Sequence, residues 1–313
     1  MSLAVVFPGQ GSQSVGMLAA LAAEQPLVRA TFDEASAVLG YDLWALVQSG
    51  PEAELNSTER TQPAMLAAGV AVWRVWRAAG APAPAMLAGH SLGEFTALVC
   101  AEALSFRDAV AAVQFRGRVM QEAVPAGEGA MAAILGLEDA EVEAACAEVA
   151  AGQVVEAVNY NSPGQLVIAG HAAAVGRALD NAKARGAKRA LLLPVSVPAH
   201  SSLLLPAGER LREHLAALPL SPPRWPVYAL GLGRHDSAEA IRRQVVAQLS
   251  SPVRWTDTVR DMIAHGASRL VECGPGKVLT ALNRRIERNR EIAMQAIEDP
   301  ASLAAALSTG ESA

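Results

Sequence analysis

The sequence predicts an α/β protein with a mainly parallel sheet flanked by helices and a small inserted βαββαβ unit. Three apolar runs predict the parallel sheet, because a glycine-containing turn and a helical stretch follow each of them: residues 3–7, 85–90 and 269–273. A different order of elements between residues 128 and 194 predicts the inserted unit. The composition agrees, since hydrophobic residues make up 51% and charged residues 18% of the 313 residues, as in a compact folded chain.

Each of the three runs is followed by the kind of turn and helix that is expected after a strand of such a sheet. The first run, 3–7, ends in a Pro-Gly-Gln-Gly loop before a predicted helix. The second run, 85–90, leads directly into Ser91 and a further helical stretch. The third run, 269–273, is followed by Gly-Pro-Gly and by a helix that begins at Val278. Repeated strand–turn–helix units of this kind are typical of a parallel sheet with helices on its faces.

The middle of the chain predicts a ferredoxin-like subdomain. The expected order is strand 130–137, helix 139–149, hairpin 154–169, helix 172–185 and strand 189–195. Because the ends of this unit return to the large domain, we expect an insertion. The predicted division is a large catalytic domain of residues 1–127 and 195–313, with a small subdomain of residues 128–194.

Charge and cysteine content exclude several classes of function. The 26 Lys and Arg residues against 31 Asp and Glu residues give a net charge of −5, so no basic field is available to bind nucleic acid. The first residues lack a basic leader, and the apolar run before Arg74 is too short for a membrane span, which predicts a soluble cytoplasmic protein. Cys100, Cys146 and Cys273 lie far apart without zinc-ligand spacing, so we expect buried thiols and no metal site.

A candidate nucleophile lies after the second predicted strand. Residues 89–93, Gly-His-Ser-Leu-Gly, match G-x-S-x-G, in which the glycines allow a sharp strand-to-helix turn that exposes the serine hydroxyl. This context favours a hydrolase-like large domain with Ser91 as nucleophile. The helix that starts near Leu92 directs free N–H groups to the turn, so the Leu92 amide is a candidate oxyanion donor.

A serine nucleophile needs a general base, and His200 is the best candidate among the six histidines. It follows the apolar run from Arg189 and a break at Pro198, which predicts a position at a strand end near the sheet edge that carries Ser91. The side chain of His90 is expected to point away from Ser91. Solvated or structural roles are expected for three others: His214, His235 and His265.

Several motifs together give the chain a family resemblance. They are the segments 7–13 (Phe-Pro-Gly-Gln-Gly-Ser-Gln), 61–64 (Thr-Gln-Pro-Ala), 89–94 (Gly-His-Ser-Leu-Gly-Glu), 116–117 (Arg-Gly), 120–121 (Met-Gln), 161–165 (Asn-Ser-Pro-Gly-Gln), 197–200 (Val-Pro-Ala-His) and 274–277 (Gly-Pro-Gly-Lys). In this order the chain resembles, over nearly its whole length, the bacterial malonyl-CoA:acyl carrier protein transacylases. It also resembles related acyltransferase domains of fatty-acid and polyketide synthases.

The resemblance implies an [acyl-carrier-protein] S-malonyltransferase. Ser91 would attack the malonyl thioester with His200 as base, and the phosphopantetheine thiol of an acyl carrier protein would then take the malonyl group, supplying fatty-acid or polyketide synthesis. The oxyanion hole of the family corresponds to the backbone N–H groups of Gln10 and Leu92, each worth roughly 3 kcal/mol of barrier. Malonyl-CoA would be a substrate, and no cofactor is expected.

The resemblance also implies the substrate-binding residues. Arg116 would hold the malonyl carboxylate, because a planar guanidinium makes two charge-assisted bonds to a carboxylate and resists neutral acyl chains. The backbone carbonyl of Gln248 would orient His200 in place of a third, acidic triad member. Asn161 and Gln165 resemble residues that line the substrate cleft of the family.

Two features bear on the pocket and on the partner. Residues 229–233, Ala-Leu-Gly-Leu-Gly, depart from the asparagine-containing segment that is usual in the family, which bears on the packing behind His200 and leaves Ser91, His200 and Arg116 intact. Carrier proteins are acidic, so a local basic patch is expected to dock them. The candidates for this patch are Lys183, Lys188, Arg189, Arg284, Arg285 and Arg288.

Two other functions compete with malonyl transfer. A serine hydrolase or thioesterase of the α/β-hydrolase type shares the G-x-S-x-G turn, but it needs an acid between the serine and the histidine and lacks the loop at 7–13. A binding module that has kept the fold and lost turnover is the second alternative. The retention of both Ser91 and His200 argues against such a module.

Overall fold

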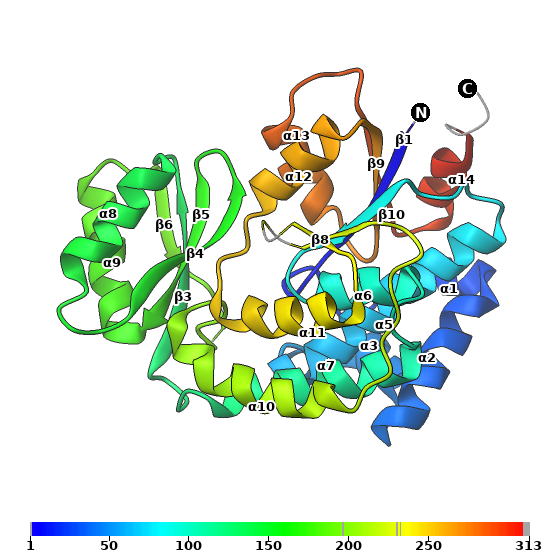
Figure 1. Cartoon of the computed structure of the whole chain (residues 1–313), viewed down its shortest axis with the longest axis horizontal. Helices are drawn as coiled ribbons and strands as arrows, with labels where there is room; N and C mark the ends of the chain where they lie inside the picture. Colours follow the sequence, from blue (N-terminus) through cyan, green and yellow to red (C-terminus); the bar gives the residue numbers. More distant parts are fainter. Residues whose placement is uncertain (1, 196, 230, 232, 309–313) are drawn as a thin grey trace.

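The computed structural model describes residues 2–195, 197–229, 231 and 233–308, which form two sheets and the helices around them (Figure 1). The larger sheet has the strand order β10-β9-β1-β2-β7-β8, and β7–β8 is its antiparallel pair. Its strands are β1 (Ser2–Phe7), β2 (Met86–Gly89), β7 (Val227–Tyr228), β8 (Arg234–His235), β9 (Ala267–Cys273) and β10 (Ala293–Ile297). The prediction of a mainly parallel sheet is therefore confirmed.

Helices cover both faces of this sheet. In Figure 1, α5 and α7 lie on one side of it and α12 and α13 on the other. The helical elements of the large domain are α1 (Ala19–Glu24), α2 (Pro26–Leu39), α3 (Leu43–Ser49), α4 (Glu52–Leu55), α5 (Thr58–Ala78), α6 (Gly93–Cys100), α7 (Phe106–Glu122), η1 (Ser202–Leu204), α10 (Leu205–Ala216), α11 (Ala238–Ala247), η2 (Gln248–Ser250), α12 (Trp255–Ala264), α13 (Val278–Ile286) and α14 (Pro300–Ser308).

Strand β1 shows why the sheet is buried on both faces. Its side chains alternate between two cores: Val5 and Phe7 pack with α5 and its neighbours, whereas Ala4 and Val6 pack with α12 and α13. A continuous apolar run, without polar alternation, is the pattern of a parallel strand covered on both faces. Strand β1 therefore lies in the middle of the large domain, with a core on each of its faces.

The inserted unit has the predicted ferredoxin-like order. It consists of β3 (Gly129–Leu135), α8 (Asp139–Val149), β4 (Val155–Ser162), β5 (Gln165–His171), α9 (Ala172–Ala184) and β6 (Arg189–Leu192). The strands form an antiparallel sheet in the order β4-β5-β3-β6. Figure 1 shows α8 and α9 on its outer face, away from the large domain. Since all these elements fall within residues 129–192, we propose the division into 1–127 with 195–313 and 128–194.

Strand β4 ties the small sheet to the large domain. The Tyr160 N–H donates to the Val253 carbonyl at 2.9 Å, and the Val253 N–H donates to the Val158 carbonyl at 2.8 Å. Val253 lies three residues after the end of η2, the short helix that carries Gln248. The inner face of the small sheet, with Met131 and Val158, is thereby held against the loops at the carboxyl end of β2.

Candidate active site

Ser91 lies on a strained turn between β2 and α6. Its φ of 50° is in the left-handed region, which a serine rarely adopts. The turn is tight enough that a Cβ added at Gly89 would lie 1.9 Å from the backbone of Gly93, and one added at Gly93 would lie 2.1 Å from the Phe7 carbonyl oxygen. Glycine is required at both positions, so the G-x-S-x-G pattern has the structural cause expected of a nucleophile elbow.

His200 is hydrogen-bonded to Ser91. The Ser91 Oγ–H donates to His200 Nε2 at 2.8 Å, and His200 Nδ1 donates to the backbone carbonyl of Gln248 at 2.7 Å. Because a carbonyl can only accept, Nδ1 carries the proton and Nε2 is free to accept. Burial, followed by the charge of Arg116, lowers the pKa of His200 to about 3. The imidazole is thus neutral near pH 7 and has the tautomer of a general base.

The route by which His200 reaches Ser91 differs from the expected one. The run from Arg189 forms β6, which belongs to the small sheet and ends at Leu192, so His200 does not lie at a strand end of the large sheet. It lies instead in the connection back to the large domain. Its own N–H donates to the Leu249 carbonyl at 3.0 Å and its φ is 69°. Backbone contacts with η2, rather than a strand, position this histidine.

Arg116 points to the same place from helix α7. Its side chain is 1% exposed, and Nη2 donates to Gln248 Oε1 at 2.7 Å and to Ser91 Oγ at 3.4 Å. Burial lowers the pKa of Arg116 to about 10, while the nearby Glu94 acts in the opposite direction, so the guanidinium is charged at pH 7. Within the described part of the chain, Arg116 Nε is buried and has no hydrogen-bond partner. A buried arginine with an unused donor suits a bound carboxylate.

Ser91, Arg116 and His200 line a pocket of about 410 Å³. The two predicted oxyanion donors, Gln10 and Leu92, contribute to its wall, together with Ser91, Arg116 and His200. Met131, Leu193 and Pro194 close it from the small subdomain. The pocket is therefore lined by residues of both the large domain and the small subdomain, and the nucleophile, the base and the cation are among them.

The two residues predicted from the hairpin loop lie in different places. Asn161 Oδ1 accepts a hydrogen bond from His90 Nε2 at 2.9 Å, next to the nucleophile. Gln165 is not among the residues that line the Ser91 pocket in the described chain, and its Oε1 accepts a bond from Arg285 of α13 at 2.7 Å. Asn159, which was not among the predicted site residues, also lines the pocket, and its Oδ1 is buried. Its only sequence signal is a position two residues before Asn161 on the same face of β4.

Glu94 is a further residue of the site, and no role was predicted for it. Glu94 is 1% exposed and accepts hydrogen bonds from His235 Nε2 at 2.6 Å and from Gln248 Nε2. Gln248, for which the sequence predicted a role of the backbone carbonyl alone, is 3% exposed, so its side chain belongs to the site as well. His235 has a structural role rather than a solvated one. It lies on β8, just after the 229–233 segment, of which residues 230 and 232 lie outside the described chain.

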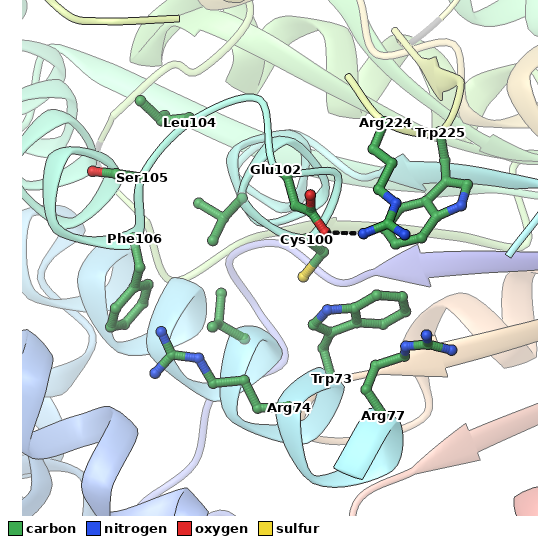
Figure 2. Close-up of a pocket in the computed structure, with 12 residues that line it drawn as sticks. Trp73, Arg74, Arg77, Cys100, Glu102, Leu104, Ser105, Phe106, Arg224 and Trp225 are labelled. Carbon is green, nitrogen blue, oxygen red and sulfur yellow. Dashed lines mark hydrogen bonds and ion pairs between the residues drawn. The ribbon is translucent and has the colours of Figure 1, made fainter. Parts of the chain in front are cut away.

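A second, larger pocket carries different chemistry. It measures about 590 Å³ and lies beside the carboxyl half of α5. Figure 2 shows Trp73 and Arg77 facing the ion pair between Arg224 and Glu102, which are 2.8 Å apart. No histidine is among its described lining residues, so it lacks a base for the nearby Ser105. The smaller Ser91 pocket is the candidate active site.

Two other kinds of feature are absent from the described residues. No group of three or more His, Cys, Asp or Glu residues is placed to hold a metal ion. No described helix combines the length and the apolar character needed to cross a bilayer. All three cysteines are buried and unpaired, as expected.

Comparison with known proteins agrees with this geometry. Residues 4–300 match the acyl transferase domain model. The chain is 56% identical over 305 residues to the malonyl CoA-acyl carrier protein transacylase of Escherichia coli, covering 97% of this chain and 98% of that protein. A solved acyl carrier protein S-malonyltransferase from Vibrio cholerae has a TM-score of 0.93 and 54% identity, covering 97% of this chain and 99% of that chain.

A second solved structure includes a partner protein. It is a type II PKS acyl-carrier protein in complex with its malonyl-transacylase, and it matches with a TM-score of 0.96 and 54% identity over 99% of this chain and 100% of that chain. The family model spans most of the chain, and the Escherichia coli relative covers nearly all of it. The chain belongs to the acyl transferase family, among the malonyl CoA-acyl carrier protein transacylases.

Proposed function

We propose that this protein transfers the malonyl group of malonyl-CoA to the phosphopantetheine thiol of an acyl carrier protein through an ester on Ser91. One observation carries the proposal: Ser91 Oγ lies between a neutral imidazole at 2.8 Å and a buried guanidinium at 3.4 Å. The first makes the hydroxyl a nucleophile, and the second selects an acyl group with a carboxylate. The names of the similar proteins support this substrate and this acceptor.

In the first half-reaction Ser91 Oγ attacks the thioester carbonyl of malonyl-CoA. His200 Nε2 accepts the hydroxyl proton, and the Gln248 carbonyl stabilises the resulting imidazolium through Nδ1–H. We assign the backbone N–H groups of Gln10 and Leu92 to the oxyanion, since both residues line the pocket. When the intermediate collapses, the C–S bond breaks, His200 returns the proton to the sulfur and CoA leaves as the thiol.

The second half-reaction reverses the first with another thiol. The phosphopantetheine S–H of the carrier protein gives its proton to His200, and its sulfur attacks the malonyl-Ser91 ester. The C–O bond breaks and Ser91 recovers its proton from His200. Throughout both steps the malonyl carboxylate would stay on Arg116. We propose that Asn161 holds the His90 side chain beside the nucleophile through its hydrogen bond. We also propose that the reaction takes place in the cytoplasm.

A hydrolase or thioesterase is not favoured. In that fold an acidic residue orients the histidine, whereas His200 Nδ1 donates to a backbone carbonyl here. The deciding measurement is mass spectrometry after brief mixing with malonyl-CoA. We expect a malonyl adduct on Ser91 that is absent in Ser91→Ala and that disappears when an acyl carrier protein with its phosphopantetheine group is added. If free malonate were released without carrier protein at the same rate as with it, the result would support hydrolysis instead.

A further inference from the structure

The buried carboxylate of Glu94 lies behind the active site and has no part in the reaction described above. It belongs to the first turn of α6, three residues after the nucleophile. Its Oε1 accepts from His235 Nε2 at 2.6 Å, and its Oε2 accepts from Gln248 Nε2. A carboxylate this deep in a protein needs such partners, but a purely structural carboxylate would not need to contact a residue of the site.

The partners of Gln248 fix the orientation of its side-chain amide. Nε2 donates its two hydrogens to the Ser91 carbonyl, at 3.0 Å, and to Glu94 Oε2. A backbone carbonyl and a carboxylate can each accept a hydrogen bond but cannot donate one. The amide oxygen must therefore face the other way, where it accepts from Arg116 Nη2 at 2.7 Å.

A reversed amide would turn its NH₂ group toward the guanidinium, so that two donors face one another. Arg116 would then lose a hydrogen bond in a site where it is 1% exposed, and it would leave the position that suits a substrate carboxylate. Glu94 is also the negative group that opposes the effect of burial on the pKa of Arg116. Both effects act on the guanidinium, and neither removes the hydrogen bond between Ser91 and His200.

The catalytic pair is held by a different part of Gln248. His200 is oriented by the backbone carbonyl of Gln248, at 2.7 Å, and not by its amide. Loss of the amide orientation therefore leaves the Ser91–His200 hydrogen bond in place. For a thioester without a carboxylate, such as acetyl-CoA, kcat/KM is therefore expected to fall much less than for malonyl-CoA.

We propose that Glu94 is a positioning residue that acts through the Gln248 side chain to hold Arg116 for the malonyl carboxylate, and thereby sets the preference for malonyl over acetyl thioesters. This inference rests on the proposed function. His235 contributes to the position of Glu94, because its Nε2 hydrogen bond holds the Glu94 carboxylate in the orientation that Gln248 requires.

The test compares kcat/KM for malonyl-CoA and for acetyl-CoA in Glu94→Ala and Glu94→Gln. In Glu94→Ala we expect the ratio of the two to fall about tenfold or more, because an interaction with a charged group is weakened for malonyl-CoA alone. In Glu94→Gln we expect a change of less than about threefold, because the amide oxygen still accepts from Gln248. The new NH₂ group can donate to His235 Nε2, since Nδ1 of that histidine has no partner in the described chain and can carry the proton.

Two more variants complete the design. Gln248→Leu keeps the backbone carbonyl and removes the amide, so it should show the same loss of selectivity as Glu94→Ala, and the double variant should lose little more. It also serves as the test if Glu94→Ala does not fold. The control is Glu102→Ala, which removes an exposed glutamate that pairs with Arg224 outside the active site.

An equal fall for both thioesters, or an unchanged ratio in Gln248→Leu, would overturn the role of Glu94. If the variants gave such a result while the wild-type enzyme still formed malonyl-Ser91, the proposed function would remain intact. Absence of the adduct in the wild type would instead defeat the proposed function itself.

Discussion

Arg116 Nη2 lies 3.4 Å from Ser91 Oγ, although Arg116 belongs to helix α7 and Ser91 to the turn before helix α6. This separation places the cation within reach of the far end of a three-carbon acyl group attached to the serine. We expect Arg116→Ala to lower kcat/KM for malonyl-CoA about a hundredfold, since a charged hydrogen-bonded contact is lost, and to raise the relative activity with acetyl-CoA. Steady-state assays with the two thioesters measure both effects. If malonyl-CoA were still preferred, Arg116 would not be the carboxylate-binding residue.

The low pKa of His200 predicts the pH dependence of acylation. The base must be neutral, and its pKa in the folded protein is lowered from 6.5 to about 3. Activity should therefore persist as the pH falls through 6.5 and decline only as the pH approaches the folded-state value. Arg116 is one cause of the lowering, so Arg116→Ala should raise the pKa of His200 and move the acid limb to higher pH.

The measurement is kcat/KM for acetyl-CoA from about pH 4 to pH 7 in the wild type and in Arg116→Ala. Arg116→Lys is the matched control, because it keeps the charge and should keep the acid limb near that of the wild type. An acid limb near pH 6.5 in the wild type would contradict the buried, neutral state of His200.

The elbow itself depends on its glycines. A Cβ at Gly89 would lie 1.9 Å from the Gly93 carbonyl carbon and oxygen, which a rotamer change cannot relieve. We expect Gly89→Ala to lower the free energy of unfolding by at least ~3 kcal/mol and to abolish Ser91 labelling. Gly176→Ala is the control: this glycine lies within α9 with no atom within 4 Å of an added Cβ, so a gain of about 0.5–1 kcal/mol is expected there. Urea denaturation of both variants gives the comparison, and similar stabilities would refute the steric argument.

The parts of the site that the sequence could predict are those with a local signal. The elbow at Ser91 requires glycines two positions away on each side, and the strand before it is a continuous apolar run. The pattern of residues 128–194 likewise predicted the βαββαβ order of elements that is observed along the chain. These features depend on neighbours along the chain, so one sequence is enough to recognise them.

The contacts behind the nucleophile could not be predicted in this way. Glu94, His235 and Gln248 come from a helix, a two-residue strand and a short helical turn that meet only in the folded chain. Polar residues in such elements are more often exposed, so burial of all three is a tertiary effect. The same holds for His200, which backbone bonds to Leu249 and Gln248 place beside Ser91.

The carrier protein is expected to dock near strand β6. Lys188 and Arg189 are exposed at its start, and Leu191 and Leu192, which are 57% and 62% exposed, follow them. The next residues, Leu193 and Pro194, line the Ser91 pocket. This edge strand thus presents cations and apolar side chains next to the pocket, a combination that suits an acidic partner whose thiol must reach Ser91.

Charge reversal tests this docking surface. We expect Lys188→Glu combined with Arg189→Glu to raise the KM for the carrier protein about tenfold, because attraction to an acidic partner becomes repulsion, and to leave the KM for malonyl-CoA unchanged. The effect should shrink as salt is added, since exposed charges are screened. The control is Arg243→Glu, which reverses an exposed cation on α11. Carrier-protein kinetics equal to those of the wild type at low salt would exclude the β6 surface, and the same rise in Arg243→Glu would show that overall charge, not this surface, governs the encounter.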